Sequence, residues 1–153
     1  MTALMSGSAG INAHFSSPPF QYTERTDPKI RTVLNNYEIL GGPATFNVVW
    51  ATSKFRNENP KAYKAFFDAL VESMDIINKD KKKAAEDYKR ITNTKESVDF
   101  LLQILNDPLV KNTVEPHKTL PIAQFLAKVK RIPAAPEKWQ DMWFPELHGM
   151  NGS

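Results

Sequence analysis

Three histidines are the side chains best suited to acid–base or metal chemistry near neutral pH. His14, His117 and His148 lie far apart, and none has a histidine or a carboxylate three or four residues away. The HExxH, GxSxG and Walker lysine motifs are also absent. We therefore predict that the protein is not an enzyme, with no catalytic residue set, no metal site and no cofactor.

Two short polar features could still contact a ligand. His14 stands beside the Ser16-Ser17 pair, so it could face a cleft, although a histidine with an internal partner is the commoner case. Gly41 and Gly42 could cradle an anion, but two adjacent glycines more often form a turn or a hinge.

The composition restricts the possible partners. Cysteine is absent, which excludes disulfides, thiolate-bound zinc and thiol catalysis in these residues. The formal net charge is only +3 and the lysines are spread along the chain, so we predict no nucleic-acid partner. There is no apolar run of the length that spans a membrane, and the first ten residues do not have the pattern of a secretory signal peptide.

All the expected strands come before Lys54. Runs rich in β-branched and aromatic residues predict strands over residues 11–15, 30–34 and 45–51. Residues 2–6 have the pattern of a final helical turn, which should not form alone, so we also expect sequence upstream of Met1.

Beyond Lys54, apolar residues recur at helical spacing. This spacing predicts helices over residues 60–78, 80–91, 97–106 and 119–130. The expected N-caps of these four helices are Asn59, Asp80, either Thr94 or Ser97, and Thr119. We expect Trp139, Trp143 and Phe144 to pack together near the C-terminus, and the last six residues to be loose.

Three separated segments resemble one family. GSAGINAHFSSPPF resembles the first cleft strand and loop of nitrate/sulfonate/taurine-type ABC-transporter solute-binding proteins, with Asn12 where the family usually has aspartate. GGPATFNVVWATSKFRNENPKAYKAFFDALVESMDIIN is similar to the return strand and long helix that follow. IPAAPEKWQDMWFPELHG is similar to the end of the family pattern.

The resemblance implies an α/β fold, the C-terminal part of a two-lobed type II periplasmic binding protein. Residues 1–40 would form the end of the second lobe with a cleft loop. Residues 41–52 would form the hinge and the crossing strand, and residues 53–153 the helices that return to the first lobe. Half of the cleft would then lie outside these residues.

The function implied by the resemblance is solute binding by lobe closure, followed by delivery to a membrane permease. The implied ligand contacts are His14, Ser16, Ser17, Phe20, Thr45 and Asn47, and the implied hinge is Gly41, Gly42 and Pro43. Their hydroxyl and amide groups suit a small organic molecule or an oxyanion, and the solute class stays open among sulfonates, nitrate, taurine and pyrimidines. Full-length family members are expected in the periplasm.

Two other functions stay open. A thiamine-pyrimidine-synthase-like enzyme shares the implied fold, but it needs a cysteine-rich segment that these residues lack. A helical protein-interaction module is the second alternative. We also expect the isolated chain to self-associate, because three strands cannot cover the apolar faces of four amphipathic helices.

Overall fold

The computed structural model describes residues 1–8 and 10–153, and its regular secondary structure in that part of the chain is entirely helical. The α-helices are α1 Thr2–Met5, α2 Phe20–Glu24, α3 Asn36–Leu40, α4 Ser53–Glu58, α5 Pro60–Lys79, α6 Lys81–Thr92, α7 Val98–Asn106 and α8 Thr119–Lys128. Two 3₁₀ turns follow, η1 Trp139–Met142 and η2 Pro145–Leu147. The predicted α/β fold class is therefore wrong.

The three predicted strands fail for one shared reason. A strand is stable only when its N–H and C=O groups pair with a neighbouring strand, and even a two-stranded hairpin is marginal in water. Residues 46–51 form no backbone hydrogen bond with another described residue, and the nearest link is a bond from Thr45 N to His117 O, 2.9 Å long. The side chains in these runs favour strands, but the described chain offers them no partner.

The four predicted helices are confirmed to within two residues at each end. Asp80 caps α6 by accepting a 2.9 Å hydrogen bond from Lys83 N, and Ser97 caps α7 by accepting one of 3.1 Å from Phe100 N. The expected cap of α8 is wrong, because Lys118 and not Thr119 occupies that position. Local spacing and capping are thus enough to define these helices.

Two short helices were not predicted. Asn35 follows the predicted strand at residues 30–34, and its side chain accepts a hydrogen bond from Tyr37 N and caps α3. Gly41 ends that helix with a φ of 70°, a conformation that glycine adopts without strain. Thr52 caps α4 by accepting a bond from Phe55 N.

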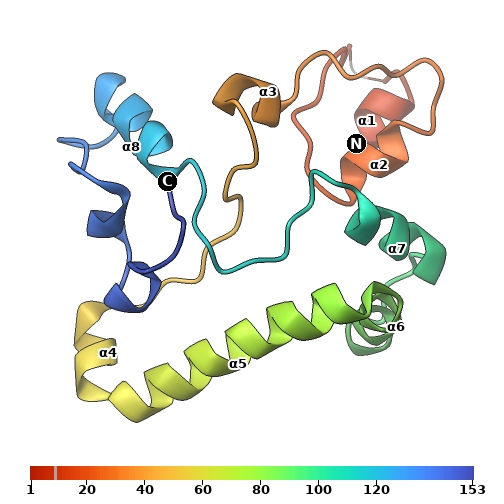
Figure 1. Cartoon of the computed structure of the whole chain (residues 1–153). Helices are drawn as coiled ribbons and strands as arrows, with labels where there is room; N and C mark the ends of the chain where they lie inside the picture. The colour runs from red at the N-terminus through yellow and green to blue at the C-terminus, as the bar shows by residue number, and fades with distance from the viewer. Residues whose placement is uncertain (9) are drawn as a thin grey trace.

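The helices form an open arrangement around a small core. Figure 1 shows α5 along one edge of the molecule, with α4 at one end and α6 and α7 at the other. Direct helix packing joins consecutive elements, α4 with α5, α5 with α6 and α6 with α7. None of the twenty residues of α5 is buried.

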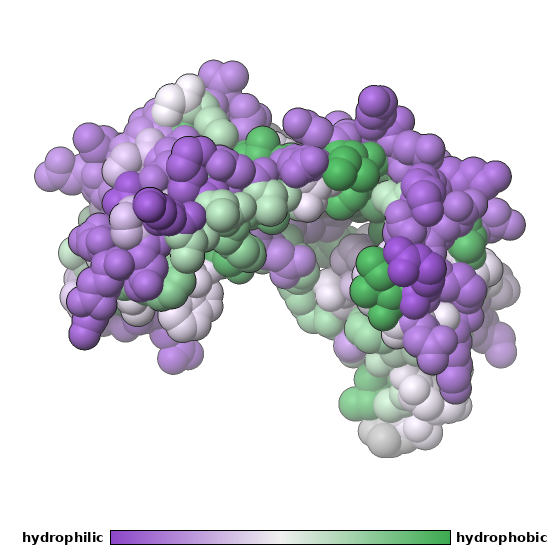
Figure 2. Space-filling model, turned by 90° about the horizontal axis from the view of Figure 1, so that it is seen from below, coloured by the Kyte–Doolittle hydropathy of each residue, from purple (hydrophilic) through white to green (hydrophobic). Residues whose placement is uncertain are grey.

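The large accessible surface area shows that the fold buries few side chains. The accessible area is 11,390 Å², whereas a compact monomer of this mass would expose roughly 7,800 Å². In the view of Figure 2, the molecule has two projecting parts that a central part connects. Apolar side chains reach the surface along the central part and on the inner side of one projecting part. Among the described helices, none combines the length and apolar composition needed to cross a bilayer.

The C-terminal segment packs against α4, α5 and α8. The Phe144 ring meets the Tyr63 ring edge-on, with 5.5 Å between centroids, and Trp143 Nε1 lies 3.4 Å from Thr119 Oγ1. The backbone of Ser153 accepts a 2.7 Å bond from Thr119 N and donates one of 2.9 Å to Pro116 O. Phe144 thus packs on Tyr63 and Trp139 on His148, and no ring contact among Trp139, Trp143 and Phe144 occurs in the described residues, so the expected cluster of the three is not seen; the prediction of a loose end is wrong.

Substitution of Gly152 tests the packing of the C-terminal segment. A Cβ at Gly152 would lie 2.7 Å from three ring carbons of Trp139, so Gly152→Ala must displace the indole. We expect a lower thermal midpoint, corresponding to about 1–3 kcal/mol of destabilisation by overpacking. Gly149→Ala is the matched control, because a Cβ there meets no atom within 4 Å. Equal melting of the two variants would contradict the packing described.

Candidate functional site

The first predicted contact residue, His14, has an internal partner. Its Nδ1 lies 2.5 Å from Glu24 Oε1, and the Glu24 side chain is buried on α2. The amino group of Met1 lies 3.8 Å from the same oxygen. These contacts favour a structural role for His14, which connects the segment before α2 to that helix.

The residues between His14 and α2 face different environments. Ser16 Oγ is buried without a hydrogen-bond partner among the described residues. The Ser17 carbonyl accepts a 2.9 Å bond from Phe20 N, so Ser17 helps to start α2, and Pro19 takes the N-cap position. Phe20 remains half exposed.

Thr45 contacts the loop that follows α7. Its Oγ1 accepts a 2.8 Å hydrogen bond from His117 N, and its own N–H donates to His117 O. The Thr45 hydroxyl is therefore engaged with backbone, while Asn47 lies exposed two residues further along.

The predicted hinge residues line the main pocket among the described residues. Its volume is about 490 Å³, and it is an open depression of the surface rather than an enclosed cavity. Gly41, Gly42 and Pro43 form one wall, and the loop of residues 107–118 forms much of the rest. The other charged or polar lining side chains are Asn78, Lys81, Asn106, Asp107, Lys111, Asn112, Thr113, Glu115, His117, Lys118 and Ser153.

The pocket can hold a polar or anionic molecule. The lining residues include three lysines, Lys81, Lys111 and Lys118, and two acidic residues, Asp107 and Glu115. Ammonium and amide N–H groups donate hydrogen bonds, which suits the oxygen atoms of an oxyanion. In the described residues, no three imidazole or carboxylate groups cluster as a metal site.

Two backbone contacts shape the pocket wall. Asn78 Nδ2, at the end of α5, donates a 2.8 Å hydrogen bond to Asn112 O and holds the loop against that helix. Lys118 N donates a 2.9 Å bond to Ser153 Oγ, which ties the far end of the loop to the C-terminal segment. The loop is therefore anchored at both sides of the pocket.

Asp107 connects this pocket to a smaller neighbouring one. Its Oδ2 accepts a 2.7 Å hydrogen bond from Tyr22 Oη, and its Oδ1 accepts one from Leu109 N. These two bonds hold the pKa of Asp107 below its ordinary value. Burial raises the pKa of Tyr22, and the bond to Asp107 raises it further. Asp107 is thus ionised and Tyr22 protonated at neutral pH.

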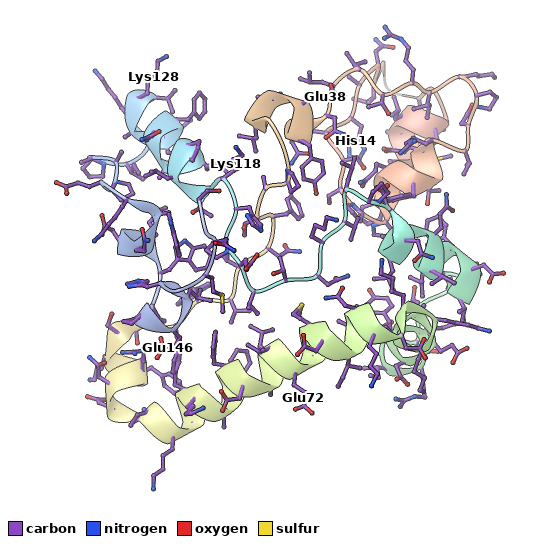
Figure 3. All side chains as sticks on the ribbon, viewed as in Figure 1. His14, Glu38, Glu72, Lys118, Lys128 and Glu146 are labelled. Carbon is purple, nitrogen blue, oxygen red and sulfur yellow. The ribbon has the colours of Figure 1, made fainter. Side chains whose placement is uncertain are left out.

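The predicted site residues do not converge on one surface. His14, Ser16, Ser17 and Phe20 belong to the region around α2, and none of them lines the main pocket. Figure 3 shows His14 in that region and Lys118 beside the start of α8, on the other side of the central segments. Only the hinge glycines and Pro43 line the pocket directly, while Thr45 touches it through His117.

The lysines and amides of the pocket were not predicted. They come from the ends of α5 and α7, the start of α6 and the loop of residues 107–118. The usable signal was the length of that loop, because connections of this length are uncommon in compact domains and often carry function.

No family model, curated protein or solved structure matches this chain. The resemblance of the three sequence segments to solute-binding proteins therefore stays a prediction.

The Tyr22–Asp107 contact gives a pH-dependent test. An acid whose pKa is lowered by folding stabilises the protein above its unfolded pKa and loses that contribution as the pH falls through the folded value. Tyr22→Phe removes the donor, which should cost about 1–2 kcal/mol at pH 7. We expect this difference from the parent protein to shrink below about pH 4.

The measurement is the thermal midpoint from pH 3 to pH 7 at one fixed protein concentration. Tyr88→Phe is the control, because Tyr88 is more than half exposed and its hydroxyl has no bond to another described residue. A Tyr22→Phe effect that stays constant across this range would show that Asp107 does not depend on the contact.

Proposed function

We propose that this chain is part of the solute-binding component of an ABC transporter, which holds a small organic molecule or an oxyanion for delivery to a membrane permease. The observation that carries the proposal is the ordered run of three sequence segments, near residues 7–20, 41–78 and 132–149, that resemble one family. The described residues contain no strand, so the proposal rests on these segments and on pocket chemistry rather than on the fold.

The pocket supports binding of a polar solute. Gly41, Gly42 and Pro43, which open the second of the three segments, line this open depression. Three lysines of the same pocket favour an anionic or oxygen-rich ligand, in keeping with the sulfonates and nitrate expected from the resemblance. The family member that contains the whole cleft would work in the periplasm.

Binding without turnover is favoured by the placement of the histidines. His117 is the histidine that lines the pocket, and its carboxylate neighbour, Glu115, lies 3.7 Å away. A hydrolytic or transfer mechanism requires a base in hydrogen-bond contact with an activated nucleophile. The pocket offers hydroxyls at Thr113 and Ser153, but the Ser153 Oγ already accepts a bond from Lys118 N.

Ligand titration followed by two-dimensional amide NMR tests this function. Because the pocket is an open depression of the surface, we expect weak affinity, in the millimolar range that this method detects. Sulfonates, nitrate and pyrimidines are added separately to the ¹⁵N-labelled protein. We expect saturable shifts with at least one class, concentrated at Gly41, Gly42 and the loop of residues 107–118.

A pair of lysine variants sharpens the test. Lys111→Gln removes a pocket ammonium and should weaken anion binding several-fold, because each close charge–charge contact contributes on the order of 1 kcal/mol near a surface. Lys128→Gln is the matched control on α8, outside the pocket lining (Figure 3). Absence of saturable shifts with all three classes, or equal weakening by both variants, would reject the pocket as the solute site.

A helical protein-interaction module is the second candidate. The observation that favours it is the exposed apolar surface of an all-helical arrangement, including Phe66 and Ile76 on α5. Monomeric proteins seldom leave large apolar patches uncovered unless another molecule binds there. A stoichiometric complex with a different protein, together with no small-molecule affinity, would favour this candidate over solute binding.

A further inference from the structure

Residues 46–51 form a segment without regular secondary structure, with backbone groups that are unpaired among the described residues and with exposed large side chains. No described residue forms a hydrogen bond with the backbone N–H or C=O groups of these six residues. Their large side chains are exposed by 67% at Phe46, 55% at Val48, 61% at Val49 and 81% at Trp50. A segment with unpaired backbone groups and β-favouring side chains can pair as a strand with another chain, in which case backbone pairing gives affinity and alternate side chains give specificity.

The sequence of the segment has none of the features that protect a free edge. Natural edge strands are kept apart by lysine, proline or inward-pointing charges. Here Pro43 and Lys54 lie outside the segment, and no charged residue or proline stands between them. The neutral sequence also means that two copies can face each other without placing like charges together.

The exposed area is large enough for a stable dimer. The chain exposes about 3,600 Å² more than a compact monomer of its mass, whereas a standard interface buries about 800 Å² on each partner. One partner copy could therefore cover the segment and part of the surface around it.

Symmetry defines how two copies would pair. In an antiparallel two-fold pair, one residue must lie opposite its own copy on the axis. With Val48 on the axis, Phe46 lies opposite Trp50 of the other copy, and all four aromatic rings share one face with the two valines. Asn47 lies opposite Val49 on the other face. Cross-strand aromatic pairs are among the stabilising pairs in sheets, which favours this register.

We propose that the chain forms a two-fold dimer through antiparallel pairing of residues 46–51, with Val48 on the symmetry axis. The occupant of this surface is a second copy of the same chain. The proposal does not rest on solute binding, because the segment lies outside the main pocket lining.

Light scattering and sedimentation test the assembly directly. The chain has a mass of 17.3 kDa, and we expect a species of twice that mass at micromolar concentration. Val48→Lys places two ammonium groups opposite each other on the axis and should weaken dimerisation at least tenfold. Circular dichroism verifies that the variant keeps its helices. A monomeric parent protein, aggregates without a defined mass, or an undiminished dimer in a folded Val48→Lys variant would each overturn the proposal.

Cysteine cross-linking tests the register and does not depend on the lysine variant. The natural chain has no cysteine, so a single introduced thiol can form a disulfide only with a second copy. Val48→Cys places two thiols directly opposite each other, at the Cβ separation of a cross-strand pair. We expect rapid disulfide-linked dimer under mild oxidation.

Val49→Cys is the matched control, because residue 49 and its copy are offset along the strands by two positions. We expect little cross-linking there, and as little at Ser73→Cys on the exposed surface of α5. Cross-linking of Val49→Cys equal to or faster than that of Val48→Cys would overturn the proposed register.

Discussion

The ion pair between Arg56 and Glu146 attaches the C-terminal segment to α4. Arg56 Nη2 lies 2.6 Å from Glu146 Oε1, and the guanidinium sits 5.3 Å from the Tyr63 ring centroid and 5.2 Å from that of Phe144. Burial alone would raise the pKa of Glu146, but its hydrogen bonds, chiefly the one from Arg56, hold it below the ordinary value. This cluster attaches α4 and the start of α5 to the C-terminal segment, which closes one corner of the open arrangement.

The open arrangement of the helices leaves both the pocket and residues 46–51 accessible. The strongest helix contacts of α5 are with α4 and α6, and none of its residues is buried, so much of α5 stays accessible. Loop 107–118 can then line a pocket with Gly41 and Gly42, while residues 46–51 leave their backbone unpaired. A more compact chain would have closed both, since apolar burial is the main favourable term in folding.

The helices were predictable because their stabilising contacts are local. Pro60 starts α5 with a preset φ, Asp80 caps α6, and Lys64 lies 2.6 Å from Asp68 one turn away. Strands lack such local contacts, so the run at residues 45–51 revealed a side-chain preference without revealing whether a partner exists. Asn35 and Thr52 show the same limit, because each caps a helix of five or six residues that is too short to produce a periodic pattern.

Of the pocket lining, the sequence identified only the residues that a special backbone conformation requires. Gly41 and Gly42 have φ values of 70° and 140°, and both line the pocket. Two adjacent glycines in a sequence indicate such a backbone conformation, because glycine adopts positive φ without strain. The sequence around Lys111 and Lys118 does not indicate that they line a pocket. A lysine in a loop is usually a solvated surface residue, and only the fold shows that these two lie in the same pocket lining. His14 and Thr45 were chosen for polar chemistry, but Glu24 and His117 already engage them. A polar side chain in a promising motif is therefore a ligand candidate only after its internal partners are known, and those partners are far away in the sequence.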